Sequence, residues 1–199
     1  FNQGIGQLHG FWDFEAERTF RQVAAIDPDC AMAYWGMAMA NYKNNERGKG
    51  FIEEAVVRKD RASGREQRWI DGLAAYFENP KADLKKRLRD YVRSLEDLAI
   101  DYPEDIEAEA FLLKHIYYNN GKGLPIPSHY TINLLADKIL TTAPDHPANH
   151  YQIHLWDRER AERALTAAAN CGPAAPGIAH MWHMPCLLYT SDAADDPAS

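Results

Sequence analysis

The sequence has 199 residues, of which 46% are hydrophobic and 26% are charged, and its formal net charge is -7. This acidic balance argues against a nucleic-acid-binding protein, which needs a basic face to neutralise phosphates. No apolar run approaches the ~18 residues that a membrane span requires, so no span is expected in this segment. The length suffices for one domain with a substantial core.

The N-terminal end carries neither an initiator Met nor a charged segment followed by an apolar one. We therefore expect the chain to be an internal fragment of a longer protein, without the start that would show a signal peptide. Localisation stays open, because cytoplasmic and exported proteins both fit this expectation. Cys30 and Cys171 lie far apart and lack CxxC spacing, so they predict small buried apolar residues and no disulfide framework.

The C-terminal end is treated separately. Residues 186–199, which begin Cys186-Leu187-Leu188-Tyr189, resemble the translation of a sequencing adapter. The segment fits no helical pattern and follows Pro185 abruptly. We expect a non-native tail that contributes nothing to stability, with a natural polar tail as the alternative. The fold is therefore sought in residues 1–185.

Helical spacing of apolar residues extends along nearly all of that region, and no pattern of period two is found. Pro28, Pro80 and Pro103 mark three helix ends, and Ser63 with Glu66 forms a capping-box pattern at a helix start. A Gly- and Pro-rich loop is expected at 119–127. The helices around these marks are expected at about 14–26, 31–39, 51–56, 63–79, 84–101, 104–118, 128–142, 146–157, 159–170 and from about 175.

One pair of these helices resembles a known repeat. Gly4, Ala16, Phe20 and Pro28 stand in the order and spacing of a tetratricopeptide repeat, over about residues 2–42. In that family the small residues let two helices approach and the aromatic ring fills the gap to the next helix. The junction recurs less closely at 101–104 and 143–146, and Glu54 stands where the pattern has an aromatic residue. A generic helical bundle is the alternative.

The resemblance implies an all-α, TPR-like α-solenoid of stacked antiparallel helix hairpins over residues 1–185. Each hairpin buries its apolar face against its neighbours, at a period of roughly 35–45 residues. Such proteins commonly bind a peptide or a partner domain on a concave face. The leading hypothesis is thus a protein-interaction scaffold, and a structural spacer is a further alternative.

Four histidines near the C-terminal end carry the clearest chemical signal. His150 and His154 are four residues apart on one expected helix, and His180 and His183 are three apart on another. Each pair shares a helix face, and successive first helices of a repeat stack lie side by side. Imidazoles at this spacing are typical ligands of zinc, copper and nickel. We therefore consider a divalent-metal site on these four residues, to which Asp157 could add a carboxylate.

Two alternatives to the metal site are a packing role and a catalytic role. The segments 146–154 and 179–185 also resemble a branch of bacterial TPR-like proteins, often parts of longer chains, but that resemblance names no activity. No HExxH, GxSxG or GxxxxGK[ST] motif is present, so no enzyme is predicted and no cofactor is assigned beyond the metal. His9, His115 and His129 stand alone in the sequence and are expected to be surface or packing residues.

Overall fold

The computed structural model describes residues 1–194, with side chains up to residue 188. Those residues form eleven α-helices and two short 3-10 helices, and no strand occurs among them. This confirms the all-α prediction. None of the helices in the described region is long and apolar enough to cross a membrane.

The chain divides into two compact units. Unit 1 comprises Phe1–Leu8 and Trp12–Leu112, and unit 2 comprises His9–Phe11 and the residues from Leu113 onward. Helices α1 to α7 begin in unit 1 and α8 to α11 belong to unit 2. Their bounds are α1 (Asn2–His9), α2 (Asp13–Ile26), α3 (Ala31–Ala40), α4 (Asn45–Val57), α5 (Gly64–Glu78), α6 (Leu84–Asp101), α7 (Ile106–Asn120), α8 (His129–Thr142), α9 (Asn149–Trp156), α10 (Leu165–Ala174) and α11 (Ala179–Ala194).

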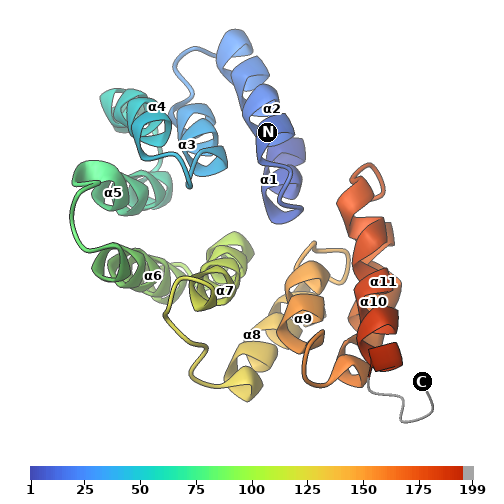
Figure 1. Ribbon diagram of the computed structural model, residues 1–199. Coiled ribbons are helices and arrows are strands. Elements are labelled where there is room, and N and C mark those ends of the chain that lie inside the picture. The colour runs from blue at the N-terminus through green and yellow to red at the C-terminus, as the bar shows by residue number, and fades with distance from the viewer. Residues whose placement is uncertain (195–199) are drawn as a thin grey trace. The chain divides into compact units, whose positions relative to one another are not determined.

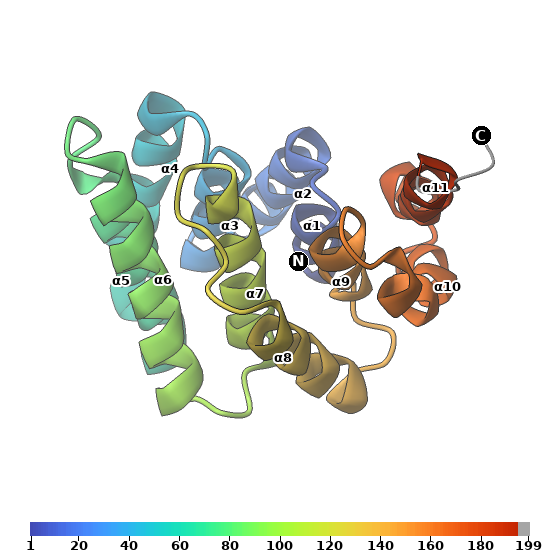
Figure 2. The ribbon, with the colours of Figure 1, turned by 60° about the horizontal axis from the view of Figure 1, so that its bottom comes forward.

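In unit 1 the helices pack in the order of the chain. α2 contacts α3, α3 contacts α4, α4 contacts α5, and α5 contacts α6. Figure 2 shows α5 and α6 running side by side. Because short connections join them, each helix buries its apolar stripe against its sequence neighbour. The predicted hairpins are thus observed as pairs of adjacent helices that pack in sequence order.

The ring of Phe20, on α2, packs between α1 and α3. Its side chain is fully buried and its ring lies 5.3 Å from that of Phe1. A Cβ atom on Gly4 of α1 would come within 2.7 Å of this ring, and one on Gly36 of α3 within 2.5 Å. The two glycines therefore allow α1 and α3 to approach the same aromatic ring. This is the packing that the sequence pattern predicted for Phe20 and Gly4.

The helix starts and stops also follow the sequence signals. At α5 the Ser63 side chain accepts a hydrogen bond from the Glu66 backbone N–H, and the Glu66 carboxylate accepts one from the Ser63 backbone N–H. This reciprocal arrangement satisfies donors that a helix start otherwise leaves unpaired.

An aromatic cluster lies in the core of unit 1. The rings of Trp35, Trp69 and Phe111 meet there with centroids 5.2–5.5 Å apart.

Unit 2 is built around α9. This helix contacts α8 before it and α10 after it, and it also contacts α11. The orange and red ribbons of Figure 1 show these elements. Contact between α9 and α11 matters because one helix carries His150 and His154 while the other carries His180 and His183.

The C-terminal part of α11 departs from the sequence expectation. The helix continues through Pro185 to Ala194, although residues 186–199 were expected to fit no helical pattern. Proline lacks the N–H that would bond one turn back, but the residues after it can still donate, so the helix persists beyond it. Leu188 is buried, which gives this extension an apolar contact. The last part of the expected tail, residues 195–199, lies outside the described residues, and a non-native origin of the tail stays a prediction.

Replacing Phe20 by Ala should destabilise unit 1 by about 3–5 kcal/mol, because the substitution leaves a cavity where three helices meet. Urea unfolding followed by tryptophan fluorescence measures the change. Phe14→Ala provides a control on the same helix, since Phe14 is 75% exposed. Equal effects of the two substitutions would contradict the packing described for Phe20.

Candidate metal centre

The first two histidines of the candidate site lie on one face of α9. The helix begins after a turn in which the Ala148 backbone N–H donates to His146 Nδ1 over 3.0 Å. From there the four-residue spacing brings His150 and His154 one above the other, as residues four apart on a helix must lie. Their ring centroids are 4.9 Å apart.

The third histidine comes from α11. His180 Nε2 lies 3.1 Å from His150 Nε2, and the two rings meet edge to face with centroids 4.9 Å apart. One nitrogen from each of His150, His154 and His180 lies within 4.8 Å of the others. Contact between α9 and α11 thus brings together three of the four histidines singled out in the sequence.

His183 lies outside this group. It is exposed, and its ring centroid is 6.4 Å from that of His180. Three residues turn a helix by roughly 300°, so two side chains at this spacing share a face only loosely. Asp157 is also absent from the converging group. Its Oδ2 lies 3.1 Å from Nδ1 of His154, which places it behind that imidazole.

Hydrogen bonds on the far side of two rings decide which nitrogen keeps its lone pair. His150 Nδ1 lies 2.8 Å from the backbone carbonyl of His9, and a carbonyl can only accept. His150 Nδ1 therefore carries the proton, and its Nε2 is left with a free lone pair. The Asp157 carboxylate imposes the same tautomer on His154. Histidine ligands in metalloproteins are commonly oriented by such carbonyl and carboxylate partners.

His9 is the functional residue that the sequence did not reveal. It was expected to be an isolated surface or packing residue, yet its carbonyl orients His150, 141 residues away. Its own ring is buried, and its Nδ1 lies 2.6 Å from the Tyr151 hydroxyl. No local spacing links residues so far apart, so no sequence pattern could have indicated this contact. His115 is buried and His129 lies 4.0 Å from Glu159, which agrees with the roles expected for them.

Two aromatic rings flank the histidines. Phe11 lies 4.6 Å from the ring of His150, 6.1 Å from that of His154 and 6.2 Å from that of His180. Tyr117 stacks on His154 with centroids 5.0 Å apart and planes inclined by 11°. These rings surround the imidazoles with apolar surface and restrict their rotation.

Burial favours the neutral form of two of the imidazoles, those of His150 and His180. The pKa of His150 lies well below its usual value, first because the ring is buried and then because His154, His180 and Lys114 are close. The hydrogen bond to the His9 carbonyl acts in the opposite direction but does not outweigh them. Burial, with His154 and His183 nearby, also lowers the pKa of His180. Neutral imidazoles offer lone pairs at neutral pH, as metal ligands must.

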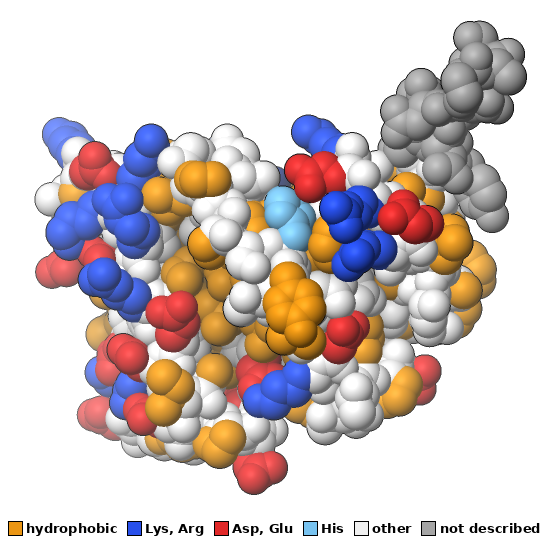
Figure 3. Space-filling view, turned by 90° about the horizontal axis from the view of Figure 1, so that it is seen from below, with side chains coloured by type: hydrophobic (Ala, Val, Ile, Leu, Met, Phe, Trp, Pro, Cys, Tyr) orange, Lys and Arg blue, Asp and Glu red, His pale blue; other side chains and the backbone are white. Residues whose placement is uncertain are grey.

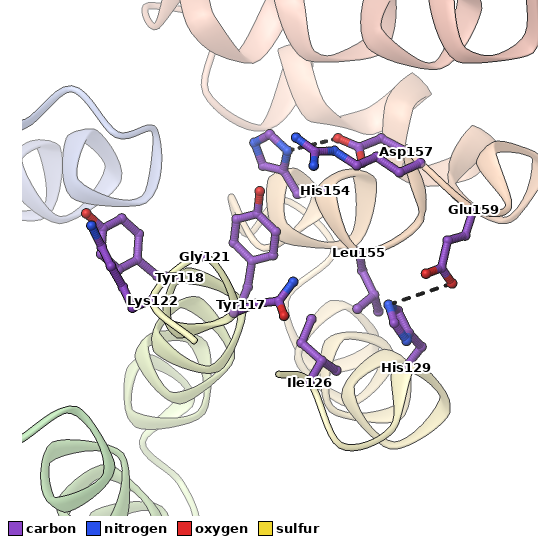
Figure 4. A pocket seen from close by; sticks show the side chains of 12 residues that line it. Tyr117, Tyr118, Gly121, Lys122, Ile126, His129, His154, Leu155, Asp157 and Glu159 are labelled. Atoms are coloured by element: carbon purple, nitrogen blue, oxygen red, sulfur yellow. Dashed lines mark hydrogen bonds and ion pairs between the residues drawn. The ribbon is translucent and has the colours of Figure 1, made fainter. Parts of the chain in front are cut away.

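A cavity of about 380 Å³ opens beside His154. Figure 4 shows His154 next to Tyr117 on its wall, with Asp157 bonded to the imidazole and the His129–Glu159 pair across the cavity. Of the three converging histidines, His154 lines this cavity. On the face shown in Figure 3, Lys and Arg side chains are interspersed with Asp and Glu side chains.

Comparison of the chain with protein-family models, with curated proteins and with solved structures finds no match.

The imidazole of His150 should remain neutral and protonated at Nδ1 when the pH falls through 6.5, because burial disfavours the charged ring. Two-dimensional ¹⁵N–¹H spectra of the ring nitrogens distinguish the two neutral tautomers from the cation. A His150 that titrates near 6.5, or that carries its proton on Nε2, would contradict the arrangement described here.

Proposed function

We propose that this chain is a helical metal-binding module, with a divalent transition metal held by His150, His154 and His180. The observation that carries the proposal is the convergence of three imidazole nitrogens, among which His150 Nε2 keeps its lone pair because the His9 carbonyl accepts a hydrogen bond from Nδ1. The proposal names a binding function and assigns no reaction to the chain.

The spacing of the nitrogens suits zinc. Two ligands of one tetrahedral Zn²⁺, each at about 2.0–2.1 Å, lie roughly 3.3 Å apart. His150 Nε2 and His180 Nε2 are 3.1 Å apart, so a small outward movement would admit the ion. The third nitrogen lies within 4.8 Å of both and would have to move closer to share the ion. Softer divalent ions such as copper would be bound by the same donors.

A packing role is the competing explanation for these histidines. Buried histidines in a core pair their ring nitrogens with fixed partners. Because His150 carries its proton on Nδ1, the Nε2–H of His180 donates to the Nε2 of His150 across 3.1 Å. A metal would take the place of that proton on His180 Nε2, and the proton would move to Nδ1 of His180 or to solvent. Titration with zinc decides between the two explanations.

Titration of the protein with Zn²⁺ should raise its melting temperature, since a ligand that binds only the folded state stabilises it by about 2.7 kcal/mol at 100 times its Kd. His154→Ala should abolish the rise. His183→Ala should leave it unchanged, because His183 lies outside the converging group. Asp157→Asn should weaken zinc binding about 10–100-fold, as loss of an orienting partner commonly does.

Calorimetric titration of the same variants separates binding from stability. Zinc binding that survives in His154→Ala, or that is lost in His183→Ala, would contradict the assigned ligands. Absence of zinc and copper binding by the unmodified chain would overturn the proposal itself.

Interaction scaffolding is a second proposal, supported by the sequential packing of helices and by one groove in unit 1. This packing is compatible with the TPR-like solenoid inferred from the sequence. The groove, about 570 Å³, lies between α4 and α5, and its apolar wall includes Ile52, Val56 and Phe77. Glu53, Glu78 and Lys49 also line it, and Lys49 Nζ lies 3.9 Å from the Glu53 carboxylate. An amphipathic peptide with basic side chains would match the apolar floor and the excess of acidic over basic side chains around it.

A fluorescein-labelled helical peptide of Leu and Lys should bind this groove, and its Leu and Glu analogue should not. Val56→Lys should weaken binding by removing apolar surface and opposing the charge. Ile26→Lys changes the net charge equally at a position that is 86% exposed and outside the groove, so it should have no effect. If both variants weaken binding equally, the attraction is general electrostatics and the groove has no role.

A further inference from the structure

We infer that Phe11 is the cap of the histidine site and that it limits a bound metal to four ligands. The inference rests on the proposed function, because it concerns the coordination sphere of an ion on His150, His154 and His180. Phe11 would act on metal selectivity without being a ligand itself.

Phe11 is the apolar side chain that reaches all three ligand rings. It lies edge to face on His150 at 4.6 Å, nearly parallel to His154 at 6.1 Å and tilted against His180 at 6.2 Å. A ring whose centroid lies 4.6–6.2 Å from those of all three imidazoles borders the group of histidines. As the proposed cap, it takes up space that solvent would otherwise fill beside an ion.

The backbone at Phe11 supports this role independently. Its φ is +55°, and it is the non-glycine residue with positive φ in the described chain. A bulky side chain in this left-handed region is disfavoured, and such strain persists only where the surrounding structure requires it. In most turns a glycine or an asparagine would adopt this positive φ with less strain. Here the strained conformation directs a large aromatic ring onto the histidine group.

The same short segment both orients and covers the site. The carbonyl of His9 accepts a hydrogen bond from the Nδ1–H of His150, and Phe11 follows two residues later. His9–Phe11 also belongs to unit 2, whereas the residues on either side belong to unit 1. The segment is thus part of the site's own compact unit, as an orienting and covering element must be.

An apolar cap changes which ions the site prefers. Zn²⁺ has no geometric preference from its d electrons and accepts four ligands. Three imidazoles and one small ligand complete that sphere. Six-coordinate ions need further water ligands, and the ring of Phe11 occupies the space for them. The cap should therefore favour zinc over nickel more strongly than three histidines alone would.

Co²⁺ is the probe that reports this directly, because four-coordinate Co²⁺ absorbs visible light intensely and six-coordinate Co²⁺ absorbs weakly. The unmodified chain loaded with Co²⁺ should show the intense bands. Phe11→Ala should lose most of that intensity as water enters the coordination sphere. Phe11→Leu, which keeps an apolar side chain, should retain it. In parallel, the ratio of zinc to nickel affinity should fall in Phe11→Ala and not in Phe11→Leu.

Phe11→Gly controls for the backbone. Glycine relieves the positive φ and removes the ring, so it should show the weak spectrum of Phe11→Ala even if it is more stable. Circular dichroism and zinc titration establish that each variant is folded and binds metal. A variant that fails these tests is replaced by Phe11→Tyr, whose hydroxyl should bring a polar group to the cap and weaken the bands.

The outcomes separate the two proposals. Absence of Zn²⁺ and Co²⁺ binding by the unmodified chain would overturn the metal site. Binding with weak six-coordinate bands in the unmodified chain, or with intense bands unchanged in Phe11→Ala and Phe11→Gly, would overturn the role of Phe11 while leaving the metal site intact.

Discussion

The candidate site depends on the contact between α9 and α11. Neither helix can bury its apolar surface alone, so each packs on neighbouring helices, and this packing sets the distance between the side chains they carry. His150 belongs to one helix and His180 to the other, and their nitrogens meet at 3.1 Å because the helices touch. The packing that stabilises unit 2 is therefore also what positions the donors.

Hydrogen bonds and a stacking contact around the imidazoles then orient their rings. Packing alone would leave three imidazoles free to rotate and to choose either tautomer. The His9 carbonyl and the Asp157 carboxylate remove that freedom, and Tyr117 holds the ring of His154 by stacking. Burial then keeps His150 uncharged. His150 therefore holds an oriented lone pair at Nε2 once the chain has folded, whereas His180 would have to shift its Nε2 proton and the third nitrogen would have to move closer to bind a metal.

Local sequence signals predicted the fold well and the site only in part. The capping box at Ser63, the stop at Pro80 and the burial of Phe20 depend on neighbours a few residues away or on a repeat pattern, and all were found. The helix through Pro185 was missed because proline usually ends one. Helical spacing pointed to the three histidines that converge but also to His183, since the sequence does not say which way α11 faces. His9 and Phe11 could not be found, because only folding brings them to α9.

The hydrogen bond between His9 and His150 spans 141 residues. Closing so long a loop carries a large entropy cost, and contacts of this kind are usually made late in folding. During synthesis the His9–Phe11 turn leaves the ribosome long before α9 and α11. It cannot make its contacts with these helices until both have been synthesised. A metal ion that binds before this contact forms would meet a His150 ring whose tautomer is not yet fixed by the His9 carbonyl. Loading of the site would then be a late event that follows the docking of the His9–Phe11 turn on α9 and α11, so metal occupancy would mark molecules in which these distant segments have met.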